Sequence, residues 1–280
     1  MTPDQIRERL SNSVTLPAIP LVARRLAGLL EGESDIKEIA ALVEQDPNLS
    51  GQILKLVNSP LYGFPGRVAN ISHALILLGL DVIKGLAVSV PVLDFLRGRD
   101  YRVWQYALNR ACSALATARE LGLHSAGEIG TAALIAGTGR ALIPGVFPEQ
   151  AAEIAKANAT KERYLHEIER SILGADAGQI GGWIAEAWQL PAVLYVPISC
   201  QYQQETEQDQ AAHGEVCAAV HVSNAVAMMI NHGSDGERFI APVRISARER
   251  LHLGPEHLVG IFSRALTDLR LLSASDLVTV

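Results

Sequence analysis

The segment from Asp46 to Pro60 carries explicit signals for the start, the buried face and the end of a helix. The Asp46 carboxylate can accept hydrogen bonds from the unpaired N–H groups of the first turn, and Pro47 suits the first helical position, where no donor is needed. Pro60 ends the helix because a proline disfavours helical geometry in the residue before it. The apolar face between these signals consists of Leu49, Ile53, Leu56 and Val57.

A second helix follows a turn-rich loop at 61–66, which combines glycine and proline with large apolar side chains. Asn70 or Ser72 can cap this helix, and Gly79 can close it in the left-handed conformation that glycine adopts easily. Elsewhere the chain has no strand pattern longer than 239–245, no internal repeat and no glycine-rich phosphate loop. The pattern therefore predicts an all-α protein.

Composition agrees with helices packed on helices. Apolar residues make up 49% of the 280 residues and aromatic residues only 5%, so the core must consist mainly of aliphatic side chains. The net charge of −6 provides no general attraction to nucleic acid or anionic lipid. The odd number of cysteines, without C-x-x-C spacing, predicts reduced thiols in a cytoplasmic protein. The N-terminus does not resemble a signal peptide, and a buried helix pair explains the apolar window 75–93 better than a membrane span.

The chain resembles the HDOD family of bacterial signalling domains. The resemblance rests on L-P-x-x-P at 16–20, Q-D-P at 45–47, L-x-x-x-I-L-K-L-V-N-S at 49–59, Tyr62-Gly63, and I-S-x-A-L-x-L-L-G at 71–79. It extends beyond Asn224. It implies an all-helical module that is related to HD phosphohydrolases but usually lacks their catalytic metal site.

The resemblance also suggests how the chain is divided. We expect two packed helical subdomains, an N-terminal one at 1–98 and a degenerate HD-like bundle at 99–232, followed by a helical extension at 233–280. Residues 201–213 are rich in glutamine and acidic side chains and predict an exposed connector, and Ser246 with Glu249 predicts a capping box. The expected helices are 4–12, 19–30, 36–44, 82–95, 104–122, 131–143, 149–158, 161–173, 177–189, 216–231 and 256–271.

The metal-binding positions of a catalytic HD domain are replaced in this chain. An HD site holds divalent metal ions with imidazole and carboxylate groups from packed helices. By resemblance, Tyr106 stands where the first histidine would be, Ala136 and Gly137 replace the His-Asp pair, Ala177 replaces a later histidine, and Asn224 replaces the late aspartate. These side chains leave too few ligands for a metal. We therefore predict no catalytic residue, no metal and no cofactor.

Other titratable residues do not rebuild a site in the sequence. Asp176 is interpreted as a helix cap or turn residue, and His221 as a hydrogen-bonded core histidine. Cys112 and Cys217 lie in apolar helices and are interpreted as small core residues. The glycine-rich stretch 136–139 is expected to allow close helix packing, so that Gly137→Asp would destabilise the fold.

Residues 74–90 have the helix–glycine–helix outline of a DNA-binding helix-turn-helix, but packing in the core explains this segment better. The second helix of this segment has almost no side chain that can read a base edge, and the arginines near it are too few for a phosphate track. We expect neither a nucleic-acid nor a membrane partner.

The function predicted from the sequence is a non-catalytic signal-transduction or output module that binds a protein partner or a small effector. Tyr62, Phe64 and Arg67 are the candidate partner-binding residues, since aromatic and arginine side chains are enriched in interface hot spots. The alternative for the aromatic residues is packing between the subdomains. The alternative function is a divergent metal-dependent phosphohydrolase with a relocated site. No receiver domain is visible, which leaves a stand-alone protein or the output part of a longer response regulator.

Overall fold

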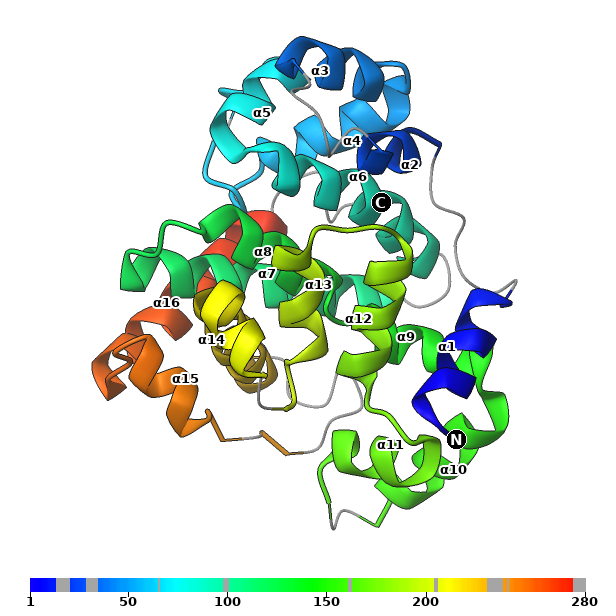
Figure 1. Ribbon diagram of the computed structural model, residues 1–280. Helices are drawn as coiled ribbons and strands as arrows, with labels where there is room; N and C mark the ends of the chain where they lie inside the picture. The colour runs from blue at the N-terminus through cyan, green and yellow to red at the C-terminus, as the bar shows by residue number, and fades with distance from the viewer. Residues whose placement is uncertain are drawn as a thin grey trace.

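The computed structural model describes residues 1–13, 21–28, 35–64, 66–97, 101–160, 163–203, 206–230, 239–240 and 242–273. In these residues the backbone forms helices joined by turns, and no strand occurs among them (Figure 1). The predicted all-α fold is therefore confirmed.

The first group of helices lies at one end of the molecule, the top of Figure 1. It consists of α2 (Leu21–Gly28), α3 (Ile36–Glu44), α4 (Pro47–Val57) and α5 (Ile71–Leu78). The predicted caps are confirmed, because Asp46 Oδ1 accepts from the Leu49 N–H at 3.0 Å and Asn70 Oδ1 accepts from the His73 N–H at 2.8 Å. Gly79 closes α5 with φ +81° but ψ 168°, which is not the left-handed helical conformation that was expected.

Helix α6 (Leu80–Arg97) connects this group to the rest of the molecule. It packs against α2, α4 and α5 at one end of the fold and against α7 and α8 at the other. One hydrophobic core runs continuously from the first group through α6 into the later helices. The subdomain boundary at 98 lies outside the described residues, and the divisions at 98 and 232 stay predictions.

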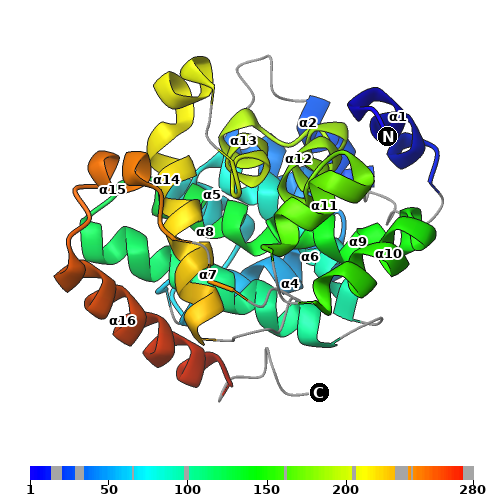
Figure 2. The same ribbon diagram turned by 90° about the horizontal axis from the view of Figure 1, so that it is seen from below.

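Helix α7 (Tyr101–Leu121) runs through the middle of the second group. It packs against α8 (Ala126–Ile135), α14 (Glu207–Ile230) and α16 (Pro255–Ser273), and Figure 2 shows α14 crossing it. The contacting faces can approach closely because α7 carries the small buried side chains Ala107, Ala111, Ala114 and Ala118. Cys112 on α7 and Cys217 on α14 are buried, which confirms their predicted core role.

The remaining helices surround this centre. They are α9 (Thr138–Val146), α10 (Pro148–Asn158), α11 (Leu165–Leu173), α12 (Ala177–Ala187), α13 (Ala192–Ser199) and α15 (Ile245–Arg250). Helix α1 (Pro3–Ser11) lies apart from α2 and docks on α12. Arg7 holds it there, with Nη1 3.1 Å from Glu186 Oε2 and the guanidinium 4.9 Å from the centre of the Trp183 ring.

The predicted single helix at 131–143 is two helices, α8 and α9. The break falls at Ala136 and Gly137, where the Ala136 N–H turns back to Ala133 O at 3.3 Å. The stretch Ala126–Val146 is long and apolar enough by composition to cross a membrane, but 72% of that window is buried inside the protein. Packing against α7, α12 and α13 accounts for its apolar character.

Two further predictions are wrong. In the described part of 201–213, Gln201 is buried and α14 begins at Glu207, so the range is not wholly an exposed connector, although Thr206 and Gln208 are exposed. Helix α13, which precedes this range, is missing from the prediction. In the sequence Pro191 indicates the end of a helix, but in the structure it is the residue that precedes α13. The capping box at Ser246 does not form, because Arg244 is the residue before α15 and Ser246 lies inside its first turn.

The tightest glycine contact in the stretch 136–139 is at Gly139. A Cβ at Gly139 would overlap the Ala177 carbonyl oxygen and lie 2.6 Å from the Gly181 nitrogen, both backbone atoms of α12. A Cβ at Gly137 would meet only the guanidinium of Arg110, at 3.7 Å, which is ordinary contact. Close approach of α9 and α12 therefore depends on Gly139.

We predict that Gly139→Ala lowers the free energy of unfolding by about 2 kcal/mol or more, because backbone atoms of α12 must shift. Gly137→Ala is the matched control. It should change stability by less than about 1 kcal/mol, since its backbone has φ −79° and the added methyl has room. Urea unfolding of both variants measures the difference, and equal losses would contradict the assignment.

Candidate functional site

The guanidinium of Arg110 lies among the positions where the resemblance places the lost metal ligands. Arg110 is 2% exposed and follows Tyr106 by one turn of α7, with its Cζ 4.9 Å from the centre of the Tyr106 ring. Its Nη2 donates to Asn224 Oδ1 on α14 at 2.6 Å and to the Tyr202 hydroxyl at 3.1 Å. Its Nη1 would lie 3.7 Å from a Cβ placed at Gly137, so Arg110 contacts two of the five replaced positions and faces a third.

At the other two replaced positions, Ala136 and Ala177, the backbone is hydrogen-bonded to a buried side chain. Gln201 Nε2 donates to Ala136 O at 2.9 Å, and the Ala177 N–H donates to Glu169 Oε2 at 2.9 Å. Glu169 is 1% exposed and its Oε1 accepts from Arg140 Nε at 2.9 Å. Burial raises the pKa of Glu169, while the positive charge of Arg140 opposes that rise. The structure therefore brings the neighbourhoods of all five positions into one polar core.

The residues present at these positions do not fit a divalent metal. They supply one phenol and one amide but no imidazole or carboxylate, and a fixed cation stands between them. Within the described part of the chain, no three His, Cys, Asp or Glu side chains gather as a metal site would require.

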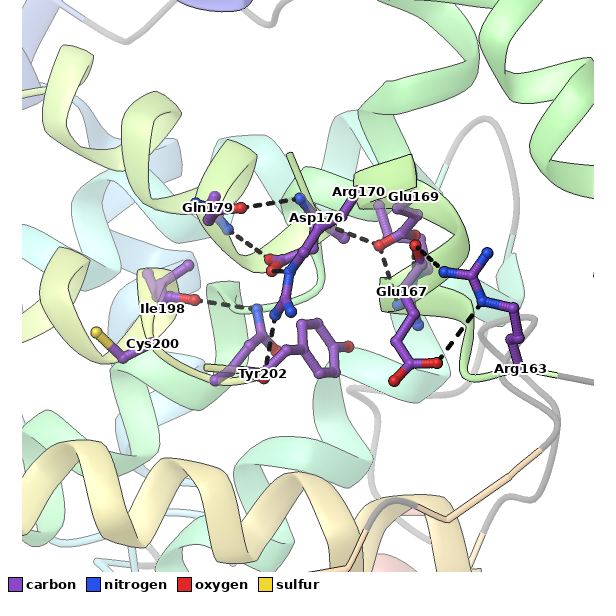
Figure 3. Close-up of polar contacts among 12 residues, drawn as sticks. Arg163, Glu167, Glu169, Arg170, Asp176, Gln179, Ile198, Cys200 and Tyr202 are labelled. Atoms are coloured by element: carbon purple, nitrogen blue, oxygen red, sulfur yellow. Dashed lines mark hydrogen bonds and ion pairs between the residues drawn. The ribbon is translucent and has the colours of Figure 1, made fainter. Parts of the chain in front are cut away.

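A second polar cluster secures the junction of α11 and α12 (Figure 3). Asp176 is fully buried and caps α12 by accepting from the Gln179 N–H at 2.9 Å, which confirms its predicted role. Arg170 Nε lies 2.8 Å from the other carboxylate oxygen of Asp176, and Arg170 Nη2 donates to Tyr202 O at 3.2 Å. This cluster fixes the position of Tyr202, which in turn bonds Arg110.

Two buried histidines lie beside this core. His221 Nε2 accepts from the Arg244 N–H at 3.1 Å, so Nδ1 carries the proton and donates to Gln201 O at 3.0 Å. The prediction of a hydrogen-bonded core histidine is confirmed. His166 stacks on Tyr202 with ring centres 5.1 Å apart and on Tyr164 at 5.5 Å. Burial and nearby positive charges lower the pKa of each histidine to about 4.

A pocket of about 210 Å³ opens next to these histidines. It shares Tyr202 and Asn224 with the Arg110 contacts, so it borders the replaced metal positions. Its lining consists of Tyr164, His166, Glu167, Gln201, Tyr202, His221, Asn224, Ala225, Met228, Pro242 and Arg244.

The candidate partner-binding loop is placed elsewhere, between the first helix group and α7. Tyr62 is 7% exposed and its hydroxyl is 2.9 Å from Thr131 Oγ1, so this ring has the packing role that was the alternative. Phe64 is half-buried against the core, and Arg67 is exposed. Arg119 Nη2 fastens the loop by donating to Leu61 O at 2.9 Å. Contact of this loop with a partner stays a prediction.

Sequence reasoning missed the residues that now fill the core, above all Arg110, Arg140, His166, Glu169 and Gln201. One signal for Arg110 was available. It is a charged residue inside the alanine-rich face of α7, four positions after Tyr106, where a helix brings side chains together.

Comparison with known proteins gives the family. The chain matches the HDOD domain over residues 16–204. It belongs to the HDOD family. A protein of Treponema pallidum (strain Nichols) is 25% identical over 190 residues, which cover 66% of this chain but only 37% of that protein. The chain thus spans little more than a third of the length of this relative.

Solved structures share the fold of this HDOD chain. A Shewanella amazonensis SB2B protein, provisionally named a phosphohydrolase, is 22% identical with a TM-score of 0.64 and covers 95% of this chain and 97% of its own. An HDOD domain protein of unknown function from Geobacter sulfurreducens is 21% identical with a TM-score of 0.60, covering 97% and 92%. A Marinobacter aquaeolei VT8 protein, provisionally named a signal transduction protein, is 20% identical with a TM-score of 0.67, covering 97% and 64%. At these identities the likeness establishes the fold.

We predict that the protein loses stability as the pH falls from about 6.5 toward 4 through His166 and His221. Because the folded state lowers the pKa of each to about 4, an unfolded chain takes up protons first, near the ordinary histidine value of about 6.5. The contribution of the two histidines to stability is therefore complete above about pH 6.5 and is lost progressively between about pH 6.5 and pH 4. Melting temperatures at pH 7 and pH 5 measure the effect.

The matched variant for this prediction is His166→Phe, which keeps a stacked ring and removes one titration. Its melting temperature should fall less between pH 7 and pH 5 than that of the original protein, by roughly 3 °C or more. The same loss in both proteins would show that His166 does not contribute.

Proposed function

We propose that this chain is a non-catalytic signalling module that acts by binding a protein partner or a small effector. One observation carries the proposal: the Arg110 guanidinium stands among Tyr106, Gly137 and Asn224, where the family resemblance places the metal ligands of HD enzymes. Arginine keeps its charge at every ordinary pH, so a metal cation in the same place would be repelled. Without the metal there is no Lewis acid to polarise a phosphate.

Supporting observations concern location and family. The described cysteines are free and buried, as expected for a reducing compartment, which favours the cytoplasm. Membership of the HDOD family and the fold shared with a protein provisionally named for signal transduction favour a signalling role. The bundle is thus used as a scaffold for binding rather than for turnover.

We predict that the purified protein, after reconstitution with manganese, iron or nickel, retains no stoichiometric metal and hydrolyses no phosphoester. The reason is the missing ligand set and the fixed positive charge of Arg110. Elemental analysis and a panel of nucleotides and cyclic dinucleotides measure this, with a catalytic HD phosphohydrolase as the positive control. One equivalent of bound metal together with turnover would establish the divergent phosphohydrolase instead.

We predict that Arg67→Ala leaves the free energy of unfolding within about 0.5 kcal/mol, because the side chain is exposed, yet weakens partner binding by about 1 kcal/mol or more. The partner is to be recovered by pull-down from the host lysate and titrated. Arg248→Ala, an exposed arginine on α15, is the control for the lost charge. Unchanged binding by a stable Arg67→Ala variant would remove Arg67 from the interface.

A further inference from the structure

The pocket of about 210 Å³ beside the replaced metal positions has walls from separate parts of the chain. Tyr164 comes from the start of α11, Ala225 and Met228 come from α14, and Pro242 comes from the segment before α15. An apolar cavity of about 150 Å³ is large enough for benzene. This pocket therefore has room for one substituted six-membered ring.

The charged side chains of the lining, Arg244 and Glu167, are engaged within the protein. Arg244 Nη1 donates to Cys200 O at 3.1 Å. The Glu167 carboxylate lies 3.9 Å from Arg163 Nε, and Figure 3 marks this pair with a dashed line. An ion that enters the pocket meets one charge of each sign in the lining, so neither a cation nor an anion gains a net attraction. The pocket favours an uncharged ligand, which loses no charge hydration on entry.

The neutral polar groups of the lining offer a ligand little. Both ring nitrogens of His221 are hydrogen-bonded to backbone groups, and Asn224 Oδ1 accepts from Arg110. His166 Nδ1 and Gln201 Oε1 have no partner among the described residues, but they lie beneath the pocket surface, where a ligand does not reach them. Both histidines are uncharged at neutral pH, since burial lowers the pKa of each to about 4. Contact with apolar surface must therefore supply the binding energy.

The apolar surface combines an aromatic ring with a thioether. The Tyr164 ring is held in place, because it stacks on His166 with ring centres 5.5 Å apart and meets the Phe239 ring edge-on at 5.9 Å. Met228 supplies a polarizable sulfur to the same pocket. Aromatic pairs and sulfur–aromatic contacts attract beyond the area that they bury. An aromatic ligand gains these contacts, whereas a saturated ring of the same size gains only the buried area.

We infer that this pocket binds a small, uncharged aromatic molecule built on one six-membered ring. The inference rests on the proposed binding function and specifies the small effector. The ligand ring contacts Met228 and Ala225 on α14 and Tyr164 at the start of α11.

The test uses the full chain with ¹³C-labelled methionine methyl groups. Met228 lines the pocket, whereas the other two methionines, Met1 and Met229, do not and serve as internal controls. Phenol should shift the Met228 methyl signal through its ring current and move the two control signals much less. The variant Met228→Leu identifies the signal by its loss.

Three further probes separate the ring from the charge. Cyclohexanol has the size and hydroxyl of phenol but no aromatic ring, and its affinity, measured by displacement of phenol, should be at least about threefold weaker. Benzoate and benzylamine keep the ring but carry a negative and a positive charge. Each should bind at least about tenfold more weakly than phenol, because the lining provides no net counter-charge.

Two variants assign the binding to the pocket. Ala225→Leu fills it and should weaken phenol binding at least about tenfold, whereas Ala212→Leu, at an exposed position of the same helix, should leave it unchanged. Tyr164→Leu keeps apolar volume but removes the ring, so the preference for phenol over cyclohexanol should fall below about twofold. Melting curves establish that each variant is folded.

Several outcomes would overturn the inference. These are no shift of the Met228 signal with phenol at concentrations on the order of 10 mM, equal affinity for phenol and cyclohexanol, or tighter binding of benzoate or benzylamine. Phenol binding that folded Ala225→Leu and Tyr164→Leu variants leave unchanged would do so as well. All of these results concern the ligand class alone, whereas bound metal with phosphoester turnover would contradict the non-catalytic function.

Discussion

Burial of the Arg110 guanidinium is the interaction on which the second half of the fold depends. An isolated charge in the core is very unfavourable, and at 2% exposure Arg110 is stabilised by two hydrogen bonds that its Nη2 donates. These bonds bring together Tyr202 and Asn224, which lie 92 and 114 positions away in the sequence. Helix α7 therefore cannot shift against α14 without breaking a charge-assisted bond.

The surrounding polar groups form a connected set. The Tyr202 hydroxyl accepts a hydrogen bond from Arg110, and the Tyr202 carbonyl accepts one from Arg170. Arg170 is also paired with the buried carboxylate of Asp176. Glu169, paired with Arg140, accepts the Ala177 N–H of the same helix start. Such a set specifies one arrangement of α7, α11, α12 and α14, since loss of any partner leaves a buried group unsatisfied. Paired side-chain charges thus hold these four helices together.

Local features of the fold could be predicted, and distant ones could not. The caps at Asp46, Asn70 and Asp176 follow from a few adjacent residues, since each side chain bonds an N–H three positions later. The resemblance also assigns the replaced metal positions one by one, and that assignment stays a prediction. The role of Arg110 beside these positions could not be predicted, because its hydrogen-bond partners come from distant parts of the sequence. Helix α13 was missed for a local reason, since the prolines at its start and within it resemble stop signals.

The pocket and the charged core are physically linked because they share residues. Asn224 and Tyr202 line the pocket and bond Arg110, while His221 lines it and binds the backbone at both Gln201 and Arg244. Displacement of Asn224 would break the buried hydrogen bond that holds α7 against α14. Helix α7 also packs against α16. Arg119 of α7 forms an ion pair with Asp268 of α16 and donates a hydrogen bond to Leu61 O in the loop. The pocket is thus connected through packed and hydrogen-bonded groups to the loop that contains Arg67.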